Sequence, residues 1–317
     1  MGTNGRLVRS PYKGGKINIE CTELDRHRAF TGGVVMAGRA EGRVGIVTGA
    51  GHGMGAAHAL ALAREGTSVA CVDVCKDLPS IALPGAAEAE LNKVVQEIRS
   101  MGRKAIPIKC DVSKAAEVEA MVKRVIGEFG KIDILVNNAG VCTFAPFWEI
   151  TEQEWDMNLD INLKGTWLCA KYVVPHMIAQ KWGRIINIGS IDGRSPEPNH
   201  AHYCASKGGV HNMTLAMARE VGEYNITVNC IAPGGVMTPM FRWAGDSFGA
   251  AQGLTREDFF AHFNKTMTIM GRQVHPEDVA NVMIWLVSEE SWTITGQVFF
   301  VDGGLRGRGS PPPEQQR

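Results

Sequence analysis

The sequence predicts an α/β protein built as a doubly wound parallel sheet. Short apolar runs alternate with longer stretches of helical period between residues 43 and 304. The run 67–74 is apolar almost without a break until Asp73, as expected of a parallel strand covered by helices on both faces. A glycine-rich turn at residues 49–55 separates the first apolar run from the first helical stretch. Because such crossovers are right-handed, these units wind into a sheet with helices on both faces.

The expected elements follow one another in a regular order. Apolar runs predict strands at residues 43–48, 67–74, 104–109, 132–136, 184–188, 226–231 and 297–301. Helical period predicts helices at residues 56–65, 88–101, 114–129, 152–180, from 203 onward, and 276–288. This gives a single domain over residues 43–304, with no second domain. Residues 1–42 lack either period and are expected to form a flexible arm, and residues 305–317 a disordered tail.

Composition and charge exclude several function classes. The 33 basic and 33 acidic residues balance, so no strong field indicates a nucleic-acid or membrane partner. No apolar run reaches the roughly 20 residues of a bilayer span, and no apolar leader with a cleavage site begins the chain. The eight cysteines are scattered without zinc spacing, which favours reduced thiols in a cytoplasmic protein and predicts no bound metal.

Tyr203 and Lys207 form the candidate reactive pair. They are four positions apart in a stretch of helical period, so their side chains share one helix face. A phenol with a pKa near ~10 is a poor acid or base at neutral pH. A nearby ammonium favours the phenolate and lowers that pKa, as a proton shuttle requires. The same spacing also occurs on ordinary amphipathic helices, so the pair needs support from the rest of the chain.

The glycine-rich turn and Asp73 together predict a dinucleotide site. Glycines allow the backbone to approach a pyrophosphate, which then rests on the positive end of the following helix. Asp73 ends the second strand, 24 positions after Gly49, where a carboxylate accepts hydrogen bonds from ribose hydroxyls and repels a 2′-phosphate. This favours NAD over NADP, although Lys76 and His52 lie close enough in the sequence to soften the preference.

Further motifs occur at the ends of the later strands. They are Asp111-Val112, Asn137-Asn138-Ala139-Gly140, Asn162 in the following helix, Ser190 thirteen positions before Tyr203, Pro233-Gly234 with Thr238, and Val301-Asp302-Gly303-Gly304. With Thr48-Gly49 and the glycines that follow, they resemble the single-domain branch of the short-chain dehydrogenase/reductases, over about residues 42–304. The resemblance implies a Rossmann fold and a nicotinamide cofactor. The long helix expected over residues 152–180 could pair with its mate in a homo-oligomer, either a dimer or a homotetramer.

The resemblance also implies a role for each matching residue. Tyr203 would be the general acid/base on the substrate oxygen, and Lys207 would lower its pKa and bind the nicotinamide ribose. Ser190 would donate a hydrogen bond to the same oxygen, and Asn162 would anchor a water that links Lys207 to solvent. The residues expected to bind the cofactor are Gly49, Gly51, His52, Gly53, Met54, Gly55, Asp73, Val74, Asp111, Val112, Asn138, Ala139, Gly140, Tyr203, Lys207, Pro233, Gly234, Val236 and Thr238.

Substrate residues are expected on loops beyond the carboxyl ends of the later strands. The candidates are Cys142, Asp192, Met240 and Trp243. The aromatic-rich segment 237–270 is interpreted as a lid over an apolar substrate or as a subunit contact. Asp192 and Arg194 would bind a polar substituent or each other, and Asp192 suits a hydroxyl or a cation better than a developing oxyanion. Trp148 and Trp155 are interpreted as packing residues.

The loop 74–85 is longer than the family's usual connection and carries prolines and apolar residues. It is either decoration or a cover that slows cofactor release, as in some bacterial members thought to hold NAD without exchange. The leading hypothesis is an NAD-dependent secondary-alcohol dehydrogenase. The alternatives are an NADH-dependent ketone reductase and a dinucleotide-sensing protein without catalysis.

Overall fold

The structure is a computed structural model that describes residues 38–81 and 83–304. The predicted tail and residues 1–37 of the predicted arm lie outside the described residues. Gly38 begins the compact unit that contains the sheet. The last part of the predicted arm, residues 38–42, packs on the end of the first helix, where the Ala40 amide donates to the Glu65 carbonyl at 3.1 Å.

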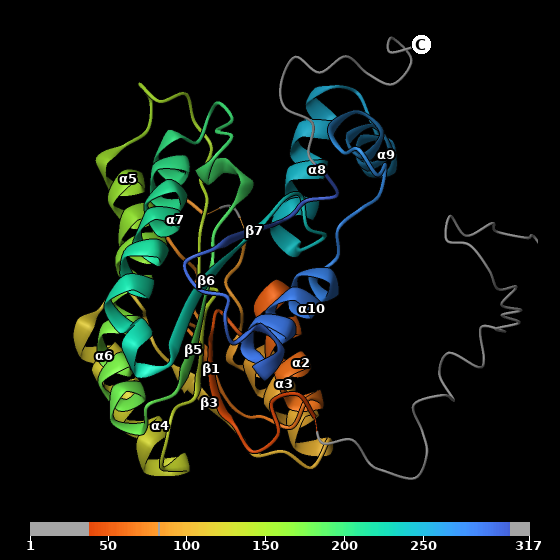
Figure 1. Ribbon diagram of the computed structural model, residues 1–317. Coiled ribbons are helices and arrows are strands. Elements are labelled where there is room, and N and C mark those ends of the chain that lie inside the picture. Colours follow the sequence, from red (N-terminus) through yellow and green to blue (C-terminus); the bar gives the residue numbers. More distant parts are fainter. Residues whose placement is uncertain (1–37, 82, 305–317) are drawn as a thin grey trace, which may run out of the picture. The chain divides into compact units, whose positions relative to one another are not determined.

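The sheet has seven parallel strands in the order β3-β2-β1-β4-β5-β6-β7 (Figure 1). They are β1 (Val44–Thr48), β2 (Ser68–Asp73), β3 (Ala105–Lys109), β4 (Ile134–Asn137), β5 (Gly183–Ile188), β6 (Ile226–Pro233) and β7 (Val298–Val301). The predicted doubly wound fold is confirmed, and every predicted strand is present within about two residues of its expected bounds. The strand order reverses between β1 and β4, which opens a crevice at their carboxyl ends.

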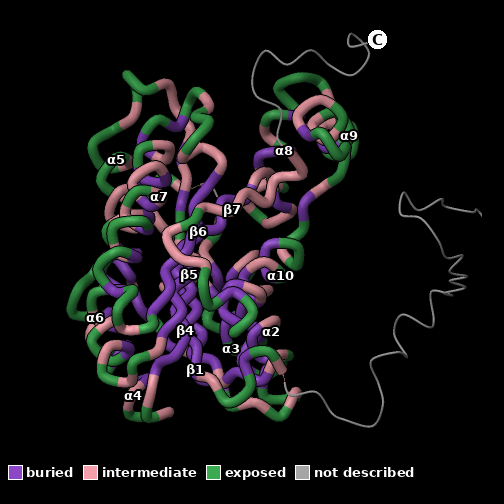
Figure 2. Tube along the Cα trace, in the orientation of Figure 1, coloured by how far each residue is buried: buried purple, intermediate pink, exposed green. Residues whose placement is uncertain are grey.

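Helices cover both faces of the sheet. One face carries α2 (Gly53–Arg64), α3 (Glu88–Ser100) and α10 (Pro276–Val287), and the other carries α4 (Ala115–Phe129), α6 (Gly165–Gln180) and α7 (Ala201–Val221) (Figure 1). Alternate residues of a strand belong to two different buried clusters, as Val47 belongs to one and Ile46 to the other. The sheet is thus buried on both sides (Figure 2), which explains its nearly continuous apolar strands.

The helix predicted over residues 152–180 is interrupted. It consists of α5 (Glu152–Leu159), a π-helical turn (Asp160–Lys164) and α6. Thr151 begins α5, and its hydroxyl accepts a hydrogen bond from the Glu154 amide at 3.2 Å. The π-helical turn inserts one extra residue per turn, so Asn162 points toward the neighbouring loop, and such turns often occur at functional sites.

The segment after β6 folds into two helices that the sequence did not predict, α8 (Pro239–Ala251) and α9 (Arg256–Met267). Pro239 follows the capping residue Thr238, whose hydroxyl accepts from the Phe241 amide at 3.4 Å. Trp148 and Trp155 were expected to pack, but they are 71% and 45% exposed. Among the described helices, none is long and apolar enough to cross a bilayer.

His58 predicts a measurable effect of pH on stability. Its ring is fully buried in α2, neither ring nitrogen has a partner among the described residues, and burial lowers its pKa to about 4. Above pH 6.5 the ring is neutral in both states. As the pH falls from 6.5 to about 4, the unfolded chain gains a proton that the folded chain does not. This pKa gap amounts to about 3 kcal/mol of lost stability.

His58→Met removes the protonation of this ring and keeps a side chain of similar size. The unfolding free energies of the variant and the wild type are measured by denaturant titration at pH 7 and at pH 4. We expect the variant to gain about 3 kcal/mol relative to the wild type between pH 7 and pH 4. Carboxylates that titrate in the same range cancel in this difference, because both proteins carry them. His176→Phe, at an exposed position on α6, serves as the control. An equal pH response in His58→Met and the wild type would contradict the assignment.

Candidate active site

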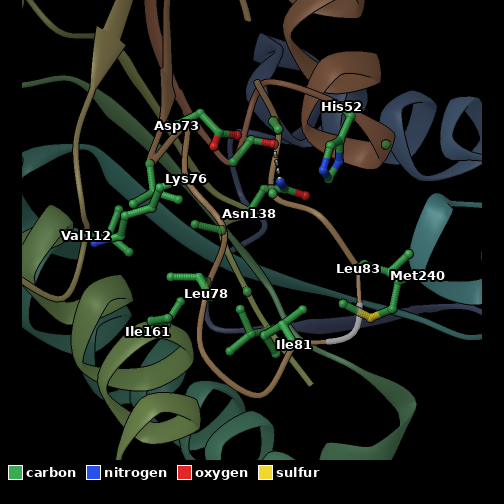
Figure 3. Close-up of a pocket in the computed structure, with 18 of the residues that line it drawn as sticks. His52, Asp73, Lys76, Leu78, Ile81, Leu83, Val112, Asn138, Ile161 and Met240 are labelled. Carbon is green, nitrogen blue, oxygen red and sulfur yellow. Dashed lines mark hydrogen bonds between the residues drawn. The ribbon is translucent and has the colours of Figure 1, made fainter. Parts of the chain in front are cut away.

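A cavity of about 220 Å³ lies at the carboxyl ends of β1, β2 and β4 (Figure 3). It is bordered by the glycine turn, by the loop after β2 and by the first residues of α8. Most residues predicted to bind the cofactor line it, namely Gly49, His52, Gly53, Met54, Asp73, Val74, Asp111, Val112, Asn138, Ala139, Gly140 and Thr238. The cavity therefore occupies the crevice where doubly wound sheets bind nucleotides.

The glycine turn is compact because side chains are missing where the backbone folds back on itself. Gly49 and Gly53 have φ angles of 65° and 59°, which favour glycine. A Cβ on Gly55 would lie 1.9 Å from the Gly49 carbonyl oxygen and 2.6 Å from the Asn138 amide nitrogen. The N-terminus of α2 thus packs directly against the turn and directs its free N–H groups to the cavity rim.

Two residues join the ends of β1 and β4 beside this turn. The Thr48 hydroxyl accepts hydrogen bonds from the Asn138 and Ala139 amides, both at 3.0 Å. The Asn138 side chain donates to the carbonyls of Thr48 and Gly49 at 3.0 and 3.2 Å. Asn138 Oδ1 is buried without a partner among the described residues, so it can accept a hydrogen bond from a ligand hydroxyl in the cavity.

Asp73 is the buried carboxylate at the end of β2. Its Oδ2 accepts from the Gly51 amide at 3.0 Å and its Oδ1 from the Cys75 amide at 3.1 Å. These bonds hold the carboxylate against the glycine turn, on the wall of the cavity (Figure 3). Lys76, which also lines the cavity, forms an ion pair with Asp111 at 3.1 Å. The residues present fit the adenosine half of NAD, with acceptors for ribose hydroxyls and an anion-binding turn.

Lys207 and Tyr203 lie on α7 beside the inner end of this cavity. Lys207 Nζ donates to the Ile188 carbonyl at 2.9 Å and lies 5.6 Å from the centroid of the Tyr203 ring. It is also 3.4 Å from the point that a Cβ on Gly140, a residue of the cavity wall, would occupy. The predicted pairing of amine and phenol therefore stands next to the predicted nucleotide site.

The pKa values of Lys207 and Tyr203 are shifted in opposite directions. Burial lowers the pKa of Lys207 to about 8. Burial also raises the pKa of Tyr203, the nearby Cys142 and Asp192 raise it further, and a hydrogen bond with Ser190 opposes them. The sequence predicted a lowered phenol pKa, and the protein alone gives the opposite direction, because desolvation of the phenolate outweighs an amine 5.6 Å from the ring.

Ser190 follows β5 and is close to Tyr203, as predicted. Its hydroxyl donates to Asp192 Oδ2 at 2.9 Å and accepts from the Asp192 amide at 3.2 Å. Asp192, which is predicted to contact substrate, contacts both Ser190 and His200, whose Nε2 lies 3.4 Å from Asp192 Oδ1. The predicted alternative pairing of Asp192 with Arg194 is not formed, since the Arg194 guanidinium lies 5.3 Å from the centroid of the Phe300 ring.

Asn162 lies in the π-helical turn, where its side chain binds the loop after β4. Its Oδ1 accepts from the Val141 amide at 2.8 Å, and its Nδ2 donates to the Val141 carbonyl and to Ser206 Oγ at 2.9 and 3.1 Å. These contacts fix the backbone next to Gly140 and Lys207. Both amide hydrogens are thereby committed, so a water at this place would have to donate to an Asn162 oxygen, either Oδ1 or the backbone carbonyl, which already accepts from the Thr166 hydroxyl at 2.8 Å.

Aromatic side chains extend from α8 to Tyr203. The Phe144 ring lies 6.0 Å from Trp243, 5.4 Å from Phe248 and 5.4 Å from His200, measured between centroids. His200 in turn lies 5.8 Å from Tyr203. Of the predicted substrate residues, Trp243 belongs to this chain of rings and Met240 lines the cavity. Cys142 is close enough to influence the pKa of Tyr203.

The remaining aromatic residues of the predicted lid have a structural role. Phe241 lies 5.1 Å from Phe260 and 5.2 Å from Phe263, and Phe259 lies 5.6 Å from Phe260. These rings pack α8 against α9. The segment is therefore a helical pair with its own small core, and only its first helix supplies residues to the cavity.

Several predicted cofactor residues lie outside the cavity wall. Gly51 donates its amide to Asp73, and Gly55 lies behind the turn. Pro233 ends β6, the Gly234 amide donates to the Val301 carbonyl at 3.0 Å, and Val236 forms a parallel bridge with Val274. Gly234 and Val236 belong to the segment that connects β6 with Thr238.

Comparisons with known proteins agree with this geometry. The family model described as Enoyl-(Acyl carrier protein) reductase matches residues 49–306. A short-chain dehydrogenase/reductase from Armillaria gallica is 40% identical over 266 residues, which cover 84% of this chain and 96% of that protein. The chain belongs to the short-chain dehydrogenase/reductase family. It is therefore an oxidoreductase with a Rossmann fold, as the motifs implied.

Two further short-chain dehydrogenase/reductases are similar over nearly their whole length. The (-)-trans-carveol dehydrogenase of Rhodococcus erythropolis is 36% identical over 272 residues, with 84% of this chain and 98% of that protein covered. The crystal structure of carveol dehydrogenase from Mycobacterium avium in complex with NAD superposes with a TM-score of 0.81 at 32% identity, and the match covers 84% of this chain and 98% of that one.

Two residues of this short-chain dehydrogenase/reductase site were missed as candidates. His200 contacts Asp192, Phe144 and Tyr203, and Phe144 connects α8 to the same histidine. They meet because Phe144 lies in the loop after β4 and His200 in the loop after β5. The ends of the Asp192 and His200 side chains meet although eight positions separate them, and a search along the sequence gives no sign of this.

Proposed function

We propose that this chain is an NAD-dependent dehydrogenase that interconverts a secondary alcohol and a ketone. One observation carries the proposal. The Lys207 amine lies beside Gly140, a residue of the cavity wall, and the Tyr203 phenol lies close to both this amine and the Ser190 hydroxyl. A dinucleotide-sensing protein without catalysis has no need of these groups at that place, so their presence argues against this second class.

The proposed mechanism assigns one task to each group. Bound NAD supplies the hydride acceptor. Tyr203 takes the proton from the substrate hydroxyl or returns it, while the positive charge of Lys207 offsets the charge on the phenolate. Ser190 stabilises charge that develops on the substrate oxygen. Asn162 holds the loop that positions Val141 and Gly140 next to Lys207, and one of its oxygens is the proposed anchor for the relay water.

The function is tested by a screen of secondary alcohols with NAD and NADP, and of ketones with NADH and NADPH. The fluorescence of the reduced cofactor is the readout. The aromatic chain from Trp243 to Tyr203 favours apolar substrates. Oxidation with NAD is the expected result, and reduction of ketones alone would support the runner-up, an NADH-dependent reductase. Cofactor binding without turnover of any compound would contradict both and support the sensing protein.

Asp73 is proposed to select NAD. Its carboxylate faces the cavity where a 2′-phosphate would lie, and the similar carveol dehydrogenase structure is an NAD complex. We expect Asp73→Ala to lower the ratio of kcat/KM with NAD to kcat/KM with NADP by about 10–100-fold, because a charged hydrogen bond contributes about 1.5–3 kcal/mol. Asp156→Ala, an exposed carboxylate on α5, should leave the ratio unchanged. An unaltered ratio in Asp73→Ala would contradict the assignment.

The loop after β2 is proposed to retain the bound nucleotide. Leu78 and Ile81 line the cavity opposite the glycine turn (Figure 3), so they would cover apolar surface of the ligand. We expect the wild type to keep NAD through dialysis, and Leu78→Ala/Ile81→Ala to release it at least about tenfold faster. Leu215→Ala, an exposed leucine on α7, is the control. Rapid exchange in the wild type would rule out retention.

The proposal also covers the oligomeric state and the cellular compartment of the protein. Trp155 and Trp167 are large apolar side chains exposed on α5 and α6, which supports a homo-oligomer, either a dimer or a tetramer. Light scattering of the purified protein would count the subunits. The described cysteines are all free, in keeping with a reducing compartment such as the cytoplasm. No nucleic-acid or membrane partner is proposed, and no metal is required by the roles given above.

A further inference from the structure

The Ser190 hydroxyl has no hydrogen free for a substrate in this structure. A hydroxyl offers one hydrogen and two lone pairs. The hydrogen goes to Asp192 Oδ2 at 2.9 Å, and one lone pair accepts from the Asp192 amide at 3.2 Å. The hydrogen bond between Ser190 and Tyr203 lowers the phenol pKa, so it is a bond that Ser190 donates to the phenolate, and it requires the same hydrogen. Ser190 can assist a developing oxyanion only if its hydrogen leaves Asp192.

Asp192 alone would oppose the reaction in two ways. An ionised carboxylate is a stronger acceptor than a neutral substrate oxygen, so it would retain the Ser190 hydrogen. Its negative charge would also repel the charge that develops on a reacting oxygen next to Ser190. The same charge already raises the pKa of Tyr203. A carboxylate at this position therefore needs a compensating cation.

His200 supplies that cation. Its ring is 8% exposed, and its Nε2 lies 3.4 Å from Asp192 Oδ1. Burial by itself lowers the pKa of His200, but hydrogen bonds with Asp192 and Cys204 outweigh it and raise the pKa to about 9. The other groups nearby are the rings of Phe144 and Tyr203, the imidazole of His202, whose own pKa is lowered by burial, and the Lys207 amine, which also interacts with Asp192 but donates to the Ile188 carbonyl. None of these supplies a second negative charge.

We propose that His200 is a positioning residue that neutralises Asp192, so that Ser190 can turn its hydrogen from Asp192 to the substrate oxygen. The inference rests on the proposed dehydrogenase function and extends it to two residues that act through Ser190. Asp192 orients the Ser190 hydroxyl in the resting enzyme. The His200 imidazolium weakens the hydrogen bond from Ser190 to Asp192, so that Ser190 can release it during the reaction. The substrate polar group that the sequence assigned to Asp192 is not needed in this arrangement.

The test is a charge-compensation cycle with His200→Phe, Asp192→Asn and the double variant. Phenylalanine keeps the ring contacts with Phe144 and Tyr203 but removes the cation. We expect His200→Phe to lower kcat at least about tenfold, because Asp192 is left uncompensated. Asp192→Asn should lower it by only about threefold, and the double variant should be faster than His200→Phe. The two substitutions are thus expected to be strongly non-additive.

Controls separate positioning from folding. Each variant is checked for its unfolding midpoint and for NADH affinity, and His200→Gln, which keeps a donor to Asp192, should recover part of the loss in kcat. His176→Phe, on the exposed side of α6, should match the wild type. A double variant as slow as His200→Phe, or slower, would overturn the proposal, as would a His200→Phe enzyme with unchanged kcat.

A second readout needs no substrate. Histidine-labelled protein titrated by NMR should show His200 protonated at pH 7 in the wild type, with a lower pKa in Asp192→Asn. Failure to find any substrate, together with this titration, would count against the proposed function and leave the ion pair standing. A His200 that is neutral at pH 7 in the wild type would overturn the inference even in an active dehydrogenase.

Discussion

Replacing Tyr203 with phenylalanine is expected to lower kcat by about 10²–10⁴-fold, the usual contribution of a general acid or base. Phenylalanine keeps the ring but loses the hydroxyl that moves the substrate proton. Lys207 would still donate to the Ile188 carbonyl, so the wall of the cavity at Gly140 should keep its shape. NADH affinity, measured by fluorescence titration, should therefore change little.

Tyr172→Phe is the matched control for this result. Tyr172 lies on α6, packed against the buried cluster beneath the sheet and away from the cavity. It should retain wild-type kcat and wild-type cofactor affinity. An active Tyr203→Phe enzyme would remove the phenol from the mechanism, and with it the role given to the Lys207 ammonium.

Replacing Gly55 with alanine is expected to weaken NAD binding by at least about 100-fold. The new Cβ would stand 1.9 Å from the Gly49 carbonyl oxygen, and both atoms belong to backbone that cannot rotate away. The glycine turn must then move off the N-terminus of α2, which separates the N–H groups that would hold a pyrophosphate. Isothermal titration with NAD measures the loss, and circular dichroism verifies that the variant is folded.

Gly127→Ala is the control that the chain itself offers. Gly127 lies in α4, and no atom stands within 4 Å of the place its Cβ would take. Alanine there should leave NAD binding unchanged and stabilise the helix by up to about 1 kcal/mol. Equal affinities for NAD in Gly55→Ala and Gly127→Ala would show that close packing of the turn on α2 has no role in binding.

Local patterns in the sequence predicted most of the sheet. The apolar runs mark every strand, because burial on both faces leaves few polar positions in them. The helix 152–180 was predicted as one stretch, because the π-helical turn at Asp160–Lys164 contains no proline or glycine that would mark a break. Helices α8 and α9 were missed because their phenylalanines face each other and make no stripe toward the sheet.

The site was predictable where its residues belong to motifs tied to strand ends. Tyr203 and Lys207 share a helix face, and Asp73 ends a strand, so their positions follow from secondary structure. The direction of the Tyr203 pKa did not follow, because it depends on burial and on Asp192 and Cys142. The pairing of Asp192 with His200 depends on the path of the loop after β5, which no periodicity encodes.

The hydrogen bonds that join Thr48 to Asn138 and Ala139 have a consequence for the kinetics of ligand capture. They are complete in the protein alone, so this corner of the crevice is rigid before any nucleotide arrives. No conformational entropy is lost there on association, and the first encounter resembles docking on a preformed surface. Any adjustment during binding is then expected at the opposite wall, where Leu78 and Ile81 line the cavity.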